Sequence, residues 1–307
     1  MVDTDRLYQD NAVYGRLIDL GLVSAANIRQ LHPKTRDQDI PVLFDTATDV
    51  VFLERISKDR FYREDSDKSE FEGDTVITET ADQGVLKSKK VEDDDRRFRQ
   101  FRELLKDKSV CDFGTGHGYF LDNCLAVCSH VSGTELRKER AAEIQDRLGA
   151  KATIKKEIGE FEDSFDVVTL FHVLEHLEDQ IGTLKEIRGR LNDGGDLIVE
   201  VPHARDFLIH KLKLKALHDF TFWSEHLILH TRQSLEAFLG EAGFQNIEIA
   251  GFQRHGFANH LHWLRHGKPG GHEIFKELTS PEIEDAYAGY LKQRDWTDTL
   301  IATARKT

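Results

Sequence analysis

The feature that most constrains this chain is a run of three glycines at alternate positions, Gly114, Gly116 and Gly118. An apolar segment that begins at Val110 precedes the run, and apolar residues at helical spacing resume after Tyr119. Strand, glycine turn and helix together form the first βα unit of a nucleotide-binding α/β domain. The glycines allow backbone angles that a Cβ forbids, and they let a ligand lie against bare backbone.

An acidic residue follows the next expected strand. Glu135 lies 17 residues after Gly118, at the end of segment 131–135, which reads VSGTE and is expected to be a second strand. In nucleotide-binding folds, a carboxylate near this position accepts two hydrogen bonds from ribose hydroxyls. The alternative is that Glu135 only provides a favourable acidic group at the start of a helix over 136–148. The spacing is a poor match to the dinucleotide pattern G-x-G-x-x-G, because Tyr119 stands at the position of the third glycine.

Two further segments extend the pattern. Residues 165–177 read FDVVTLFHVLEHL, which predicts a buried strand that runs into a histidine-bearing turn. Residues 194–202 read GGDLIVEVP and predict another strand. With an acidic residue, Asp112, ahead of G-x-G-x-G, the set resembles class I methyltransferases that depend on S-adenosylmethionine. The resemblance covers roughly half of the chain directly, and the order of elements matches this family through about residue 250.

The resemblance implies a Rossmann-like α/β fold, a seven-stranded and mostly parallel sheet with an antiparallel last strand. It also implies S-adenosylmethionine as the cofactor, bound at the carboxyl ends of the strands. Glu157 and Ile158 resemble the position that contacts adenine. The family usually has an aspartate near there, where this chain has Gly159 and Glu160, so the adenine contact stays open. The implied cofactor-binding residues are Asp112, Gly114, Thr115, Gly116, Gly118, Glu135, Leu136, Glu157, Ile158, Phe171 and His172.

Strand and helix patterns alternate through the middle of the chain, which indicates a parallel sheet with right-handed crossovers. A helix capped by Thr231 and ended by Gly243 follows, and then come strands over 246–250 and 298–306. The earlier strands are expected at 109–114, 130–135, 152–157, 165–171 and 196–201, and the helices between them at 119–128, 136–148 and 179–191.

We predict an N-terminal module or lid over 1–95 and a methyltransferase domain over 96–307. Helical spacing predicts a helix over 11–31, and the apolar runs 42–44 and 50–53 predict a β-hairpin. Some relatives carry a cysteine zinc ribbon in this region, but this chain has no cysteine before Cys111.

The polar stretch 61–95 is either a solvated loop or a lid that touches the substrate through Phe61, Tyr62 or Phe71. Two insertions, over 203–230 and 252–295, are expected on the substrate side of the fold. The first contains HDFTFWSEHL at 218–227, which resembles an F-x-x-E-H-L segment in family members linked to sugars and cell-surface glycans. The alternative is that this segment is a packed cover with Trp223 in the core.

Histidines crowd the second half of the chain, since 12 of the 15 lie between His172 and His272. Histidine titrates near neutral pH, so a general base for an acceptor hydroxyl is expected among them. His176 and His226 are the first candidates, ahead of His172 and His203. No metal site is predicted, because neither an H-E-x-x-H nor a two-histidine, one-carboxylate spacing is visible.

The formal charge of −13 without a basic block argues against a nucleic-acid partner. No apolar stretch of about 18 residues occurs, so no membrane span is expected. The three cysteines lack zinc-site spacing and indicate buried thiols in a reducing compartment. With no secretory signal visible at the start, we expect a cytoplasmic protein, and we leave a homodimer open.

The predicted function is methylation, at oxygen or carbon, of a sugar, nucleotide-sugar or glycan precursor. The resemblance suggests the sugar, and the spacing does not show it. Within the class, the alternative substrate is a phenolic or quinone-type molecule, although such substrates favour apolar pockets. Outside the class, the alternatives are a NAD-dependent oxidoreductase or epimerase and a catalytically silent subunit that binds S-adenosylmethionine.

Overall fold

The computed structural model describes residues 4–60 and 83–307. Its main element is a seven-stranded sheet in the order β10-β11-β8-β7-β4-β5-β6. β4, β5, β6, β7 and β8 pair in parallel, and β11 is antiparallel to both β8 and β10. The strands are β4 (Ser109–Phe113), β5 (His130–Thr134), β6 (Ala152–Lys155), β7 (Phe165–Phe171), β8 (Leu191–Pro202), β10 (Gln245–Phe252) and β11 (Thr299–Arg305). The seven-stranded, mostly parallel α/β architecture expected from the sequence is confirmed.

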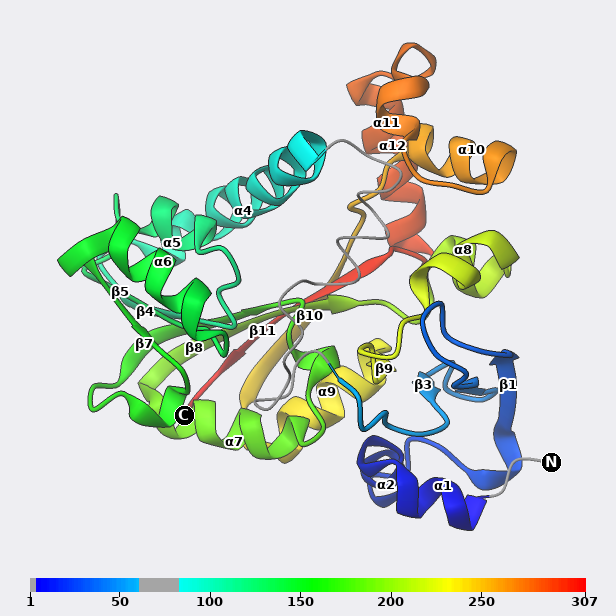
Figure 1. Ribbon diagram of the computed structural model, residues 1–307, viewed down its shortest axis with the longest axis horizontal. Coiled ribbons are helices and arrows are strands. Elements are labelled where there is room, and N and C mark those ends of the chain that lie inside the picture. The colour runs from blue at the N-terminus through cyan, green and yellow to red at the C-terminus, as the bar shows by residue number, and fades with distance from the viewer. Residues whose placement is uncertain (1–3, 61–82) are drawn as a thin grey trace.

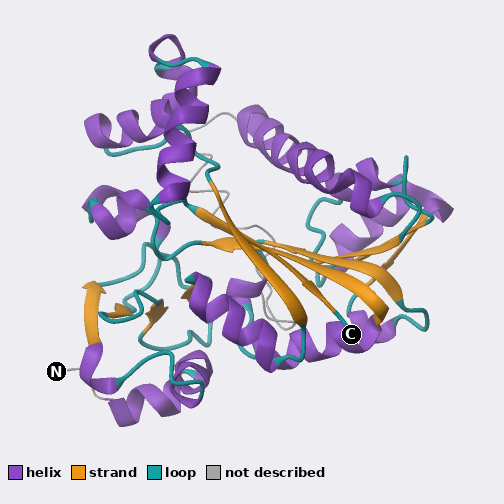
Figure 2. Ribbon diagram, turned by 180° about the vertical axis from the view of Figure 1, so that it is seen from behind, coloured by secondary structure: helices purple, strands orange, loops and turns teal. Residues whose placement is uncertain are grey.

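Helices cover both faces of this sheet. In Figure 1, α4, α5 and α6 lie on one face, while α7 and α9 lie on the other. Figure 2 shows the strands passing between these two layers from behind. The helices are α4 (Gln83–Leu105), α5 (Tyr119–Cys124), α6 (Lys138–Leu148), α7 (Gln180–Arg190) and α9 (Arg232–Glu241). α9 has the predicted ends, since Thr231 caps it and Gly243 follows it with φ +90°.

The N-terminal residues form a small four-stranded sheet with two helices beside it. Its order is β1-β2-β3-β9, all antiparallel, and the predicted hairpin is confirmed as β2 and β3. The last strand comes from the first insertion, far along the chain. The elements are α1 (Thr4–Asp10), α2 (Ala12–Asp19), β1 (Ile28–His32), β2 (Val42–Asp45), β3 (Val51–Leu53) and β9 (Ile228–Leu229).

The helix predicted over 11–31 is wrong after Asp19. Gly21 adopts φ +66° and turns the chain, and Ile28 begins a strand that pairs with Asp45. The apolar residues that suggested one long helix are divided among α2, the following turn and β1, and Val13, Leu17, Leu22 and Ile28 all belong to one buried cluster.

The two sheets share one apolar core. Leu17 and Phe52 of the N-terminal residues belong to the same buried cluster as Val168 and Leu170 of β7. The predicted boundary at residue 95 falls inside α4. The division into a module over 1–95 and a domain over 96–307 stays a prediction, and the lid residues Phe61, Tyr62 and Phe71 lie outside the described residues.

The second insertion forms a helical group beside the end of β10 (Figure 1). Ser280 caps its longest helix, and Pro281 occupies the first helical position, where a missing N–H is tolerated. The group consists of α10 (Phe257–His266), α11 (Gly271–Ile274) and α12 (Pro281–Gln293), and α8 (Lys215–Thr221) of the first insertion lies nearby.

Asn11 links the N-terminal helices to their sheet. Its side chain is fully buried; Oδ1 accepts from the N–H of Tyr14 at 3.1 Å, and Nδ2 donates to the carbonyl of Leu53 at 2.6 Å. We predict that Asn11→Ala lowers the free energy of unfolding by about 2 kcal/mol, because a helix cap and a buried hydrogen bond are lost together. The exposed Asn192 is the control, and Asn192→Ala should change stability by less than about 0.5 kcal/mol in the same urea titration. Equal stability of the two variants would contradict this role.

Asp206 predicts a pH dependence of stability. Burial and the nearby carboxylate of Asp298 raise the pKa of Asp206 to about 7. The folded state therefore binds more protons than the unfolded state between about pH 4 and pH 7, and stability falls as the pH rises through this range. Asp206→Asn keeps an oxygen for the N–H of Ile209 and should flatten this fall, becoming more stable than the parent at pH 8. Thermal melting across pH measures it, with the exposed Asp285→Asn as control; a parallel profile for Asp206→Asn would refute the assignment.

Candidate functional site

The glycine turn joins β4 to α5 as the sequence predicts. Gly114, Gly116 and Gly118 all have positive φ, at +76°, +58° and +72°. A Cβ on Gly114 would lie 2.7 Å from the side chain of Val173, whereas a Cβ on Gly116 would meet nothing within 4 Å. The turn therefore packs against the next segment at Gly114 and leaves an open approach to the backbone at Gly116. This is the cradle that a cofactor lying against backbone requires.

Glu135 lies beside this turn. It follows β5 directly, is only 9% exposed, and its Oε1 accepts from the N–H of Arg137 at 2.9 Å. Burial raises the pKa of this carboxyl, while the N–H groups of Arg137 and Gly116 act in the opposite direction. The contact with Gly116 places the carboxylate at the open part of the turn, where the sequence expects it. A ribose diol fits such a carboxylate, so these residues suit an adenosyl cofactor.

Asp112 lies just before the glycine turn and links it to the neighbouring strand β7. The carboxyl is buried at the end of β4 and accepts from the hydroxyl of Thr169 on neighbouring β7 at 2.6 Å. Burial raises its pKa to about 6, although the Thr169 hydrogen bond works against this rise. Thr115 is also buried, and its N–H donates to the carbonyl of Thr134 on β5. Both residues tie the turn to adjacent strands.

The remaining predicted cofactor residues differ in their surroundings. Leu136 is 44% exposed, and Glu157 caps the short helical turn Ile158–Glu160 at the surface. Ile158 itself is buried in the main core. Phe171 ends β7 and lies edge-on to Phe120 of α5, with ring centroids 5.0 Å apart. Phe171 is therefore near the glycine-turn helix, whereas the side chain of Ile158 serves core packing.

Glu200 is a buried carboxylate that was not among the predicted site residues, and it lies near the carboxyl ends of β7 and β8. Glu200 in β8 is fully buried and pairs across the sheet with Phe171. It accepts from Arg96 at 2.9 Å, from Arg97 at 2.8 Å and contacts Nε2 of His172 at 3.2 Å. These contacts hold α4 against the carboxyl ends of β7 and β8. A charge within the apolar run Ile198–Val201 was the available signal.

His172 is placed by this network. Its φ of +56° turns the chain sharply after β7, and its Nδ1 lies 3.2 Å from Oε1 of Glu175. Burial and Arg254 lower its pKa, but the hydrogen bonds with Glu175 and Glu200 outweigh them and hold the pKa above its ordinary value. Arg254 also pairs with Asp93 of α4. His172 therefore connects the carboxyl end of β7 to Arg254 in the second half of the chain.

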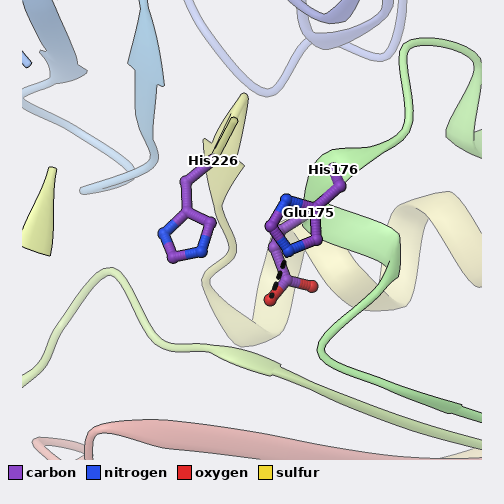
Figure 3. A group of neighbouring side chains, drawn as sticks. All are labelled: Glu175, His176 and His226. Atoms are coloured by element: carbon purple, nitrogen blue, oxygen red, sulfur yellow. Dashed lines mark ion pairs between the residues drawn. The ribbon is translucent and has the colours of Figure 1, made fainter. Parts of the chain in front are cut away.

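The two histidines predicted as bases come together with a carboxylate. His176 and His226 lie with ring centroids 5.0 Å apart, and Nε2 of His176 lies 4.0 Å from Oε1 of Glu175. Figure 3 shows the imidazole of His226 facing Glu175 and His176 from a separate segment. The N–H of Leu227 donates to the carbonyl of Glu175 at 2.9 Å, which fixes one segment against the other. His203 is instead buried beside the final strand, with Nδ1 2.9 Å from the carbonyl of Thr297.

A family model described as a methyltransferase domain matches residues 90–249, which are 160 of the 307 residues. The match begins within α4 and ends within β10, so it includes the glycine turn, Glu135 and the histidine cluster. The chain belongs to this methyltransferase domain family. S-adenosylmethionine is the cofactor that the family and the fold indicate.

Two curated relatives are similar over part of their length. One is the mitochondrial ubiquinone biosynthesis O-methyltransferase of Candida albicans, 32% identical over 130 residues, which are 38% of this chain and 39% of the relative. The other is the tRNA U34 carboxymethyltransferase of Aliarcobacter butzleri, 24% identical over 161 residues, which are 47% of this chain and 50% of that relative. The chain thus spans half or less of the curated relatives it matches.

Among solved structures, a methyltransferase of Archaeoglobus fulgidus described as SAM-dependent is 18% identical with a TM-score of 0.49. The alignment covers 73% of this chain and all of that one.

None of the helices in residues 4–60 and 83–307 combines the length and apolar character needed to cross a bilayer.

The position of Glu135 at the open glycine turn gives a direct prediction. Glu135→Ala should weaken the binding of S-adenosylhomocysteine at least tenfold, because two ribose hydrogen bonds to a carboxylate are lost. Glu139→Ala, an exposed acid on the following helix, should leave the affinity unchanged. Isothermal titration calorimetry measures both. Equal affinity of the Glu135 variant and the parent would leave Glu135 as a helix-start residue only.

Proposed function

We propose that this protein transfers a methyl group from S-adenosylmethionine to a hydroxyl of a small polar acceptor, of the sugar, nucleotide-sugar or glycan-precursor type. One observation supports it most: the glycine turn, Glu135 and the pair Glu175 and His176 follow the carboxyl ends of β4, β5 and β7, which lie side by side, and His226 joins that pair from the first insertion. Donor and acceptor groups thus belong to one edge of one sheet.

In this proposal, different residues bind the methyl donor and the acceptor. When bound, S-adenosylmethionine supplies a methyl group already activated on a sulfonium. The glycine turn and Glu135 would hold the adenosyl part, while Asp112 keeps the turn in register with β7 through Thr169. The enzyme's main contribution is to hold the acceptor oxygen in line with the methyl group. In this proposal, His176 and His226 receive the acceptor hydroxyl.

The polar surroundings of the cluster support a polar acceptor. Arg60 is 3% exposed and donates to the backbone carbonyl of His176, and it lies 3.4 Å from the carboxylate of Glu225. Charged and hydrogen-bonding groups suit a molecule with many hydroxyls better than an apolar ring. Trp223 is only 4% exposed, however, so its face is packed as a cover. The sugar preference therefore depends on the polar groups and on the sequence resemblance.

A phenolic or quinone-type acceptor is a second candidate. The observation that favours it is the 32% identity, over 130 residues, to a ubiquinone biosynthesis O-methyltransferase. The family match argues against a NAD-dependent oxidoreductase or epimerase. Methylation at carbon instead of oxygen would need no histidine near an acceptor hydroxyl, so the cluster favours oxygen.

The test is an acceptor panel with the purified protein. Release of S-adenosylhomocysteine is followed with nucleotide-sugars, free sugars and catechol-type phenols as acceptors. We expect turnover with a sugar-type acceptor and a loss of at least 100-fold in rate for His226→Ala, since this residue is proposed to receive the acceptor hydroxyl. Turnover with phenols alone would replace the first proposal by the second. Tight cofactor binding without turnover on any acceptor would support a silent subunit.

A further inference from the structure

We propose that Glu175, His176 and His226 form a binding site for one divalent transition-metal cation. Each residue offers one ligand atom, and these three atoms all lie within 4.8 Å of one another. Figure 3 shows them converging from two segments, the helical turn Leu174–His176 and the residue just before Leu227. Two imidazoles and one carboxylate are a donor set that proteins use to bind transition metals.

The carboxylate of Glu175 is arranged as a ligand. It is fully buried, and its Oε1 lies 3.2 Å from Nδ1 of His172. Its Oε2 is buried without a hydrogen-bond partner among the described residues. A buried carboxylate oxygen without a partner is costly, and a cation would satisfy it. The contact with His172 orients the group in the way that a hydrogen bond behind a metal ligand does.

The imidazole of His176 has the tautomer that a ligand needs. Its Nδ1 lies 2.9 Å from the backbone carbonyl of Glu225, and only an N–H can donate to a carbonyl. In the neutral ring the lone pair is therefore on Nε2, the nitrogen that lies 4.0 Å from Oε1 of Glu175. A backbone carbonyl behind the distal nitrogen is the usual second contact of a metal-binding histidine.

Charges around the cluster are compatible with a cation. A metal ion binds the neutral form of an imidazole, so the donors of the site are the carboxylate of Glu175 and the neutral rings of His176 and His226. The nearby Arg60 is already paired with Glu225 at 3.4 Å and with Glu178 at 2.9 Å. The site therefore presents one anionic ligand and two neutral ones.

The donor set also selects the class of ion. Metal–nitrogen and metal–oxygen bonds of about 2.0–2.2 Å place ligands about 3–3.5 Å apart, so the three atoms need to close by about 1 Å. Mg²⁺ and Ca²⁺ prefer oxygen ligands, whereas imidazole suits Zn²⁺, Co²⁺, Mn²⁺ and Fe²⁺. At the acceptor edge such an ion could bind a substrate hydroxyl, a role that depends on the proposed function; the binding site itself does not.

A second cluster, Asp206, His260 and Asp298, is less suited to a metal. Asp206 accepts from the N–H of Ile209, and Asp298 accepts from the N–H groups of Arg254 and His255. Their carboxylates already serve the backbone, so this cluster is explained as a structural network.

The test is a titration of the metal-free, full-length protein with Co²⁺, followed by visible absorption and calorimetry. We expect one equivalent to bind, with at least tenfold weaker binding in His226→Ala and in Glu175→Gln. His210→Ala is the matched control, since His210 is a half-buried histidine beside Asp49 and belongs to no part of the site. It should bind Co²⁺ like the parent.

Folding and cofactor binding are checked on the same samples. Co²⁺ should raise the melting temperature of the parent and of His210→Ala, but not that of His226→Ala. If Glu175→Gln does not fold, His226→Ala decides, because this side chain is only partly buried. Binding of S-adenosylhomocysteine without any binding of Co²⁺, Zn²⁺ or Mn²⁺ would overturn this inference and leave the proposed function standing. Equal Co²⁺ affinity of His226→Ala and the parent would also overturn it.

Discussion

The buried carboxylate of Glu200 holds together the edge of the sheet at which the donor and acceptor groups gather. A carboxylate in a fully buried strand position is tolerated only when it is paired and hydrogen-bonded. Arg96 and Arg97 satisfy it from α4, and His172 satisfies it from the end of β7. Removing one side of such a buried network costs about 3–5 kcal/mol, because a charge is left without a partner. The position of α4 over the strands therefore depends on this residue.

The same network connects the donor and acceptor parts of the site. His172 contacts Glu200 on one side and Glu175 on the other. Glu175 is next to His176, and its backbone carbonyl is bound by the residue that follows His226. A chain of hydrogen bonds thus runs from α4, the helix that precedes β4 and the glycine turn, to the cluster of Glu175, His176 and His226. This continuity explains how segments from different parts of the chain keep a fixed relation at one edge of the sheet.

Local pattern was enough to predict the parallel strands of the main sheet, and the family resemblance supplied the number of strands and the antiparallel last strand. Apolar runs and glycine breaks gave the strands from β4 to β8, and Thr231 and Gly243 marked the ends of α9. Failures occurred where a contact distant in sequence decides the outcome. The segment after Gly21 joins a sheet instead of a helix because β2 is available as a partner. β9 completes that sheet from the first insertion, and nothing in its own two residues indicates this partner.

For the site, too, local signals could be predicted from the sequence, whereas contacts between distant segments could not. Glycine spacing and Glu135 were visible locally, because cofactor groups follow strand ends in a fixed order. A two-histidine, one-carboxylate set was not visible, since His226 lies 50 residues after His176 and only folding brings them together. A nitrogen lone pair that binds an ion cannot accept a proton, so with a metal bound these histidines would act on an acceptor hydroxyl through the ion and not as bases.

The central claim is that the glycine turn binds an adenosyl cofactor of methyl transfer. Calorimetric titration of the unmodified protein with S-adenosylhomocysteine, and in parallel with NAD, tests it most directly. The account predicts binding of one S-adenosylhomocysteine per chain and no measurable binding of NAD. Binding of NAD without S-adenosylhomocysteine would contradict it and would assign the turn to dinucleotide chemistry.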